Sequence, residues 1–179
     1  MISEKAIKSV NSIFAKAAMA NLAINGSDNI EVSQLSDAKL EHLPGKGIVV
    51  LTISSYLFRL LILFHINPDE STKRYFTKSD CDQEFFEVFG EHGNLCVGEM
   101  NRDLGNHFLH LGMSTPYALE SKCAPFISEL NPSYLSHHRI GINGDIALHA
   151  TLCLCAYAPL DFHYQVSETI EETGELELF

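Results

Sequence analysis

Glu91 and Asn94 have the residue types and the spacing of a small site for binding or catalysis. Residues three apart on a helix project side by side. A carboxylate can pair with a cation, and a side-chain amide both donates and accepts hydrogen bonds, which suits it to hold a water molecule. The pattern Glu-x-x-Asn recurs by chance in many helices, where both residues simply face solvent. The pair becomes a candidate site only through the elements that carry it.

Other reactive side chains are weaker candidates. His92 and Cys96 are four residues apart, as in a nucleophilic Cys–His pair, but Cys96 falls on the apolar side of the predicted helix, so a buried structural thiol is expected. The later histidines lack the spaced cysteine or carboxylate partners of a metal site. We therefore expect surface or strand-edge residues, and no bound metal, at His137, His138, His149 and His163.

The helix that carries Glu91 and Asn94 is predicted over residues 82–112, with Ser79-Asp80 as its N-cap. On a helical wheel centred on Phe89, the apolar residues that fall within about 60 degrees are Phe85, Phe86, Cys96, Met100, Leu104 and Leu111. The opposite side is a polar stripe formed by Glu84, Glu87, Glu91, Asn94, Gly98, Arg102 and Gly105. Arg102 and its neighbour Asp103 have the character of solvated helix charges.

The remaining elements follow from hydrophobic periodicity and turn residues. The pattern predicts a helix over 2–24, a short strand within 29–43, a hairpin of 47–54 with 56–66, a short helix from 67–70 to 76, a strand near 117–122, an irregular or weakly helical segment over 123–135, and a hairpin of 139–142 with 145–157. Asn143-Gly144 supplies the positive φ angles of a type I′ turn in the last hairpin. We expect one domain over 1–165, followed by a glutamate-rich tail over 166–179 that is an edge strand or disordered.

Composition excludes several classes of function. The net charge of −11 disfavours binding to nucleic acids or anionic membranes. The five cysteines are odd in number and lack a C-x-x-C pair, so neither a disulfide framework nor a zinc site is expected, and Cys153 and Cys155 are predicted to fill the core. No signal peptide is apparent, and the most apolar stretch, 56–66, contains Arg59 and is too short to cross a bilayer. A cytoplasmic location is therefore expected.

The segment 90–98, GEHGNLCVG, resembles the signature helix of the CheC/CheX family of response-regulator phosphatases. In that family an acidic residue, two variable residues and an asparagine are followed by a small residue, and a proline comes about 22 residues later. Here Pro116 follows Asn94 with 21 residues between them. The order of predicted elements over 1–165 also agrees. A single motif is present, as in CheX-like members. His92-Gly93 stands where residues that favour helix formation are common in the family. Gly93 therefore either permits close packing or bends the helix.

The resemblance implies a function and a role for each motif residue. Asn94 would orient the water that attacks the aspartyl phosphate of a CheY-like receiver domain, and Glu91 would pair with a lysine of that receiver. Gly98, Glu87 and Arg102 are the expected partner-binding residues; Gly98 would allow close approach of the receiver or serve internal packing. Mg²⁺ would belong to the receiver, and no cofactor is expected on this chain.

The resemblance also implies an α/β (α+β) fold. We expect a mostly antiparallel sheet with the N-terminal helix and the motif helix packed on one face. A homodimer is expected too, with the long strand 145–157 offering an edge for a shared sheet. The alternative is a receiver-binding or flagellar-switch-like adaptor of the same fold that catalyses nothing. A structural module in which Glu-x-x-Asn is accidental is the third possibility.

Overall fold

A computed structural model describes residues 1–36, 43, 45–77 and 81–165, and its elements follow the predicted order. The elements are α1 (Glu4–Asn21), β1 (Ile30–Leu35), β2 (Gly47–Ser54), β3 (Phe58–Ile66), α2 (Glu70–Phe76), α3 (Asp82–Gly105), β4 (Gly112–Met113), β5 (Tyr117–Glu120), the 3-10 helix η2 (Ser121–Leu130), β6 (Tyr134–Ile142) and β7 (Ile146–Ala156). The predicted N-cap at Ser79-Asp80 and the tail over 166–179 lie outside the described residues.

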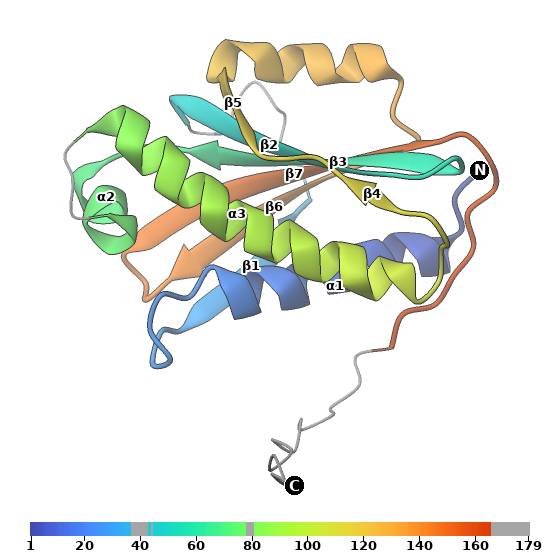
Figure 1. Ribbon diagram of the computed structural model, residues 1–179, viewed down its shortest axis with the longest axis horizontal. Helices are drawn as coiled ribbons and strands as arrows, with labels where there is room; N and C mark the ends of the chain where they lie inside the picture. The colour runs from blue at the N-terminus through green and yellow to red at the C-terminus, as the bar shows by residue number, and fades with distance from the viewer. Residues whose placement is uncertain (37–42, 44, 78–80, 166–179) are drawn as a thin grey trace, which may run out of the picture.

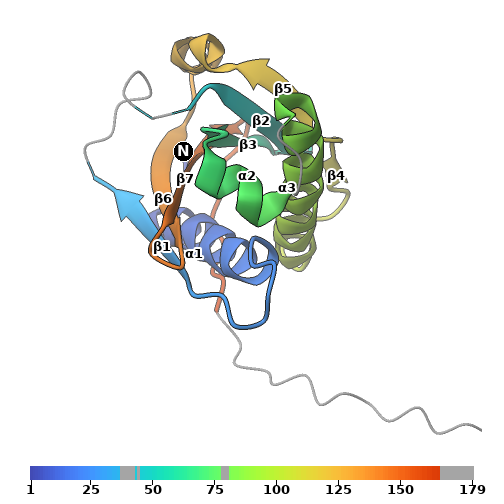
Figure 2. The ribbon, with the colours of Figure 1, turned by 90° about the vertical axis from the view of Figure 1, so that its left-hand side faces the viewer.

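The strands form one seven-stranded antiparallel sheet in the order β1-β6-β7-β3-β2-β4, with β5 also paired to β2. Helices α1 and α3 lie side by side on one face of this sheet, and α2 lies near one end of it (Figures 1 and 2). The predicted fold class, with the N-terminal and motif helices on one face of an antiparallel sheet, is confirmed.

The β6–β7 hairpin turns at Asn143-Gly144, where φ is 53° and 78°. Two successive positive φ angles are the requirement of a type I′ turn, as predicted. The prediction that 145–157 offers a free edge is wrong, because β7 is hydrogen-bonded to β6 on one side and to β3 on the other. A shared sheet between two copies would have to form at β1 or at β4 and β5, so the homodimer stays a prediction.

The main core lies between the sheet and the helices. Phe14 of α1, Phe64 of β3 and Phe89 of α3 are fully buried there. The rings of Phe64 and Phe89 meet edge to face with 5.6 Å between their centroids, and the rings of Phe14 and Phe64 are 6.3 Å apart. This geometry is favourable for aromatic pairs and joins both helices to the middle of the sheet.

The other face of the sheet is covered in part by η2, which Figure 1 shows as the helix at the top of the molecule. Ala124 and Ile127 of η2 pack on β2, β3 and β7. Cys153 and Cys155 lie in this second cluster and are buried, as predicted for core residues. The segment 123–135 was predicted as irregular or weakly helical, and it divides into η2 and the first residues of β6.

Helix α3 ends at Gly105, seven residues before its predicted end. Asn106 caps it, and His110 adopts a φ of 58°, which is incompatible with a continuing right-handed helix. Leu111 therefore lies outside the helix, although it still packs against the core. The helical wheel correctly predicted that Leu111 contacts the core. It wrongly predicted that Leu111 belongs to the helix, because the chain turns at 106–110 and returns to the sheet.

The prediction that His137 and His138 lie at the surface or at a strand edge is wrong. His137 and His138 are buried, because β6 is an interior strand and its two faces are both covered at these positions. His137 Nδ1 is 2.9 Å from the Thr151 hydroxyl, which is also 2.8 Å from His65 Nε2. His138 Nε2 is 3.2 Å from the Ser136 hydroxyl and its ring lies against Phe14.

These buried histidines make stability depend on pH. Burial, with the neighbouring histidines, lowers the pKa of His65 and of His138 to about 4, below the ordinary value of 6.5. Between these values the unfolded chain binds protons that the folded chain does not, so the free energy of unfolding falls as pH drops from about 6.5 towards 4. Each histidine contributes a slope of up to about 1.4 kcal/mol per pH unit.

Urea unfolding at pH 7, 6 and 5 measures this slope, and His138→Gln is expected to reduce it. The control is His163→Gln, at an exposed position, which should leave the slope of the wild type unchanged. An identical slope in His138→Gln and in the wild type would contradict the prediction.

Candidate functional site

Glu91 and Asn94 lie together on α3, on the side of the helix away from the core. Glu91 is exposed and Asn94 is half-buried. Within the described part of the chain, neither side chain has a hydrogen-bond partner or an ion-pair partner. Both are therefore free to bind an incoming group without first breaking an internal contact.

Gly93, between them, lies in close contact with the sheet and does not interrupt the helix. The residue is buried, and α3 is continuous from Asp82 to Gly105. A Cβ atom at Gly93 would lie 3.4 Å from Leu51 Cδ1 and 3.4 Å from Phe64 Cε2. The helix thus packs closely on the side chains of Leu51 in β2 and Phe64 in β3, which supports the packing role among the two possibilities left open by the sequence.

Gly98 is different, because a Cβ atom there would meet no atom within 4 Å. It is half-buried and lies one turn after Asn94. Internal packing among the described residues therefore does not require this glycine. The space above it is open to a partner.

The other two predicted partner-binding residues lie at either end of the same stripe. Glu87 is exposed, and its Oε1 accepts a hydrogen bond of 3.3 Å from Gln83 Nε2. Arg102 is exposed near the end of the helix. At 1.5 Å of rise per residue, the two Cα atoms are about 22 Å apart along the axis, so only a large partner could contact both.

Pro116 contacts α3 close to the motif residues. A Cβ atom at Gly90 would lie 3.5 Å from Pro116 Cγ, in ordinary van der Waals contact. Just before the proline, the Ser114 N–H donates to the Thr52 carbonyl at 2.9 Å, and the Thr52 N–H donates to Ser114 Oγ at 3.0 Å. These two bonds anchor the chain on β2 and direct Pro116 against the motif helix.

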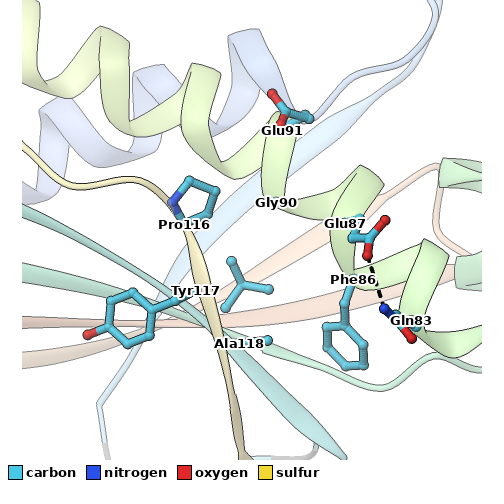
Figure 3. Close-up of a pocket in the computed structure, with 9 residues that line it drawn as sticks. Gln83, Phe86, Glu87, Gly90, Glu91, Pro116, Tyr117 and Ala118 are labelled. Carbon is cyan, nitrogen blue, oxygen red and sulfur yellow. Dashed lines mark hydrogen bonds between the residues drawn. The ribbon is translucent and has the colours of Figure 1, made fainter.

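A groove lies between α3 and β5, and we call it the α3–β5 groove. Its volume is about 460 Å³, and it is lined by Val49, Gln83, Phe86, Glu87, Gly90, Glu91, Pro116, Tyr117 and Ala118. Figure 3 shows Gly90 and Pro116 at its end nearest to Glu91, with Phe86 farther along the helix.

The sequence analysis did not predict the groove, because it assigned Phe86 to the core side of the helix alone. Phe86 is half-buried: it packs against the core, as predicted, and also lines the groove. One residue in the sequence could have indicated the groove. Gly90 lies about 100 degrees from Phe89 on the helical wheel, at the boundary between the apolar side and the polar stripe.

The opposite flank of α3 is held by an ionic network that includes Asp103, which was predicted to be solvated. Instead, Lys16 Nζ lies 3.0 Å from Asp103 Oδ2 and 3.2 Å from Glu99 Oε1. Tyr164 also donates a hydrogen bond of 2.9 Å to Asp103. Burial alone would lower the pKa of Lys16, but its hydrogen bonds to Asp103, Tyr164 and Glu99 outweigh burial and raise the pKa. The network joins α1, α3 and the C-terminal segment.

His92 and Cys96 do not form a nucleophilic pair. Cys96 is fully buried, and burial raises the pKa of its thiol far above the ordinary value, so it stays protonated as a structural core residue. The His92 ring lies against Phe76, with 5.4 Å between the ring centroids. The expected structural role of Cys96 is confirmed.

Two further searches of the described residues were negative. No group of three or more histidine, cysteine, aspartate or glutamate side chains there has the arrangement of a metal site. No helix in the same residues has both the length and the apolar character needed to cross a membrane.

No protein-family model matches the sequence, and no curated protein sequence is significantly similar to it. Solved structures do match. A chain of the CheX–CheY–BeF3–Mg complex from Borrelia burgdorferi is 14% identical, with a TM-score of 0.58 over 83% of this chain and 96% of that chain. CheX from Vibrio vulnificus is 13% identical, with a TM-score of 0.58 over 81% of this chain and 98% of that chain.

The middle domain of FliM from Vibrio alginolyticus also matches, with 10% identity and a TM-score of 0.53 over 82% of this chain and 91% of that chain. At such identities the likeness establishes the fold alone. That fold is shared by CheX proteins and by a FliM domain.

A matched pair of glycine substitutions tests the packing role of Gly93. Leucine at position 93 would collide with Leu51 and Phe64, whereas leucine at position 98 meets open space. Both changes gain the same helix propensity, so their difference isolates packing. We expect Gly93→Leu to be less stable than Gly98→Leu by about 1–3 kcal/mol in urea unfolding. Equal stabilities would show that α3 does not pack on the sheet at Gly93.

Proposed function

Because this chain has the fold of CheX and CheC-like proteins and presents Glu91 and Asn94 on its long helix, we propose that it is a phosphatase. Its substrate would be the aspartyl phosphate of a CheY-like receiver domain, in chemotaxis or a related two-component pathway. The observation that carries the proposal is that neither motif side chain is buried and that both lack internal partners among the described residues. A receiver partner implies a cytoplasmic location.

In this proposal, Asn94 positions the attacking water. Its carbonyl oxygen accepts a hydrogen bond from the water, and its amide group donates another. Hydrolysis of a phosphoryl group needs the water in line with the bond that breaks, and orientation with charge stabilisation provides most of the catalysis. The protein needs no strong base for this step, and the Mg²⁺ belongs to the receiver.

Glu91 contributes to binding in the same proposal. Its carboxylate lies one turn before Asn94 and pairs with a lysine of the receiver, which sets the register of α3 against the phosphorylated aspartate. Gly98 leaves space for the receiver surface one turn beyond Asn94. Glu87 and Arg102 extend the contact along the helix.

The second candidate is an adaptor that binds a receiver or a flagellar-switch component and catalyses nothing. The similarity of the fold to the middle domain of FliM favours it. The two candidates differ in whether the chain shortens the lifetime of the phosphoryl group.

The test measures the lifetime of phosphoryl-aspartate on a panel of CheY-like receivers from the same cell, with Mg²⁺. Wild type is expected to shorten the lifetime on one receiver, and Asn94→Ala to reduce that rate at least about 100-fold while binding persists. Glu91→Gln is expected to weaken binding. Glu84→Gln, an exposed glutamate on the same helix, is the matched control and should behave as wild type.

If wild type leaves every lifetime unchanged, catalysis is ruled out. Phosphorylation-dependent binding in that case would establish the adaptor. If substitutions of Glu91 and Asn94 change neither hydrolysis nor binding, the Glu-x-x-Asn pattern is accidental.

A further inference from the structure

We propose that the α3–β5 groove is a socket for one apolar side chain of the receiver, carried next to a basic residue. The inference rests on the proposed function and adds a specificity-determining site to it. The groove shares Glu91 with the candidate catalytic pair, and Gly90, on its wall, lies one helical turn before Asn94. A side chain bound there would therefore sit beside the phosphoryl group.

The lining of the groove suits an apolar occupant. Val49, Phe86, Pro116 and Ala118 provide apolar walls from β2, α3 and the start of β5. The volume of about 460 Å³ is more than enough to admit one apolar side chain. Its carboxylate and amide side chains come from the helix, where Gln83 donates a hydrogen bond to Glu87. Apolar anchors in such pockets provide much of the affinity of protein interfaces.

Two glycines keep the groove open. A Cβ atom at Gly47 would lie only 2.5 Å from Phe86 Cζ, so the glycine lets the Phe86 ring lie over the start of β2. Gly90 leaves the helical wall without a side chain, directly opposite Pro116. Any longer side chain at position 90 would project into the space between α3 and β5. The groove thus depends on two small residues from distant parts of the sequence.

The negative charge at the edge of the α3–β5 groove favours a receiver segment in which a basic residue lies next to the apolar side chain. Glu87 and Glu91 are four residues apart on one face of α3, and like charges at this spacing repel. No described cation pairs with either carboxylate. A lysine or arginine from a partner would relieve the repulsion. A second copy of this chain, with a net charge of −11, is a poor occupant for the same reason.

The experiment fills the groove without changing Glu91 or Asn94. Gly90→Leu fills it from the helix, and Ala118→Trp fills it from β5, where the native side chain is exposed. The control is Gly105→Leu, also on α3, where a Cβ atom would meet nothing within 4 Å. Folding of each variant is checked by its unfolding temperature. Hydrolysis kinetics on the phosphorylated receiver and binding to the beryllofluoride-loaded receiver are then measured.

We expect Gly90→Leu and Ala118→Trp to raise KM and weaken binding at least about tenfold, with kcat near that of the wild type. Glu87→Lys is expected to weaken binding and to reduce its dependence on salt. Gly105→Leu should match the wild type in all measurements.

The outcomes separate this inference from the proposed function. If wild type hydrolyses the phosphoryl group and both groove-filling variants keep its KM and affinity, the socket is disproved and the phosphatase stands. A fall in kcat with unchanged KM would also overturn the socket. If wild type neither hydrolyses nor binds any receiver, the proposed function fails and the assignment of the groove fails with it.

Discussion

The close packing of α3 on the sheet at Gly93 is the constraint on which the candidate site depends. A Cβ atom at Gly93 would already touch Leu51 and Phe64, so a longer side chain does not fit there, and this contact, together with the buried apolar residues of α3, fixes which side of the helix faces outward. Glu91 and Asn94 then lie on the outer side with no internal partners among the described residues. A larger side chain at position 93 would lift or rotate the helix and move both residues together.

Two further contacts prevent rotation of α3 about this point. On one flank, Glu99 and Asp103 pair with Lys16 of α1, and Tyr164 of the C-terminal segment joins them. On the other flank, Pro116 packs against the helix at Gly90. Each contact holds α3 in a fixed orientation relative to a neighbouring segment. Catalysis by positioning requires such rigidity, since small displacements of a water-orienting group are costly in rate.

The candidate catalytic pair and the α3–β5 groove lie next to each other on the outward side of α3 and form one continuous surface. Core residues and the ionic network occupy the inward sides of the helix. The outward side carries Gly98, the α3–β5 groove and two carboxylates that have no ion-pair partner in the described part of the chain. The same fold occurs in a CheX protein and in a FliM domain, so the fold alone does not identify the function. Individual side chains on this surface must do so.

The order of the elements, the Asn143-Gly144 turn and the outward position of Glu91 and Asn94 could be predicted from the sequence, because these depend on local periodicity and turn chemistry, whereas the antiparallel α/β fold was predicted from the resemblance of the motif to a known family. The end of α3, the interior position of β7, the burial of His137 and His138 and the pairing of Asp103 were decided only by tertiary structure. Each depends on which strand or helix lies beside the residue, and local periodicity carries no information about neighbours distant in the chain. The α3–β5 groove belongs to this second group, because residues near positions 47, 90 and 116 come together only in the folded protein.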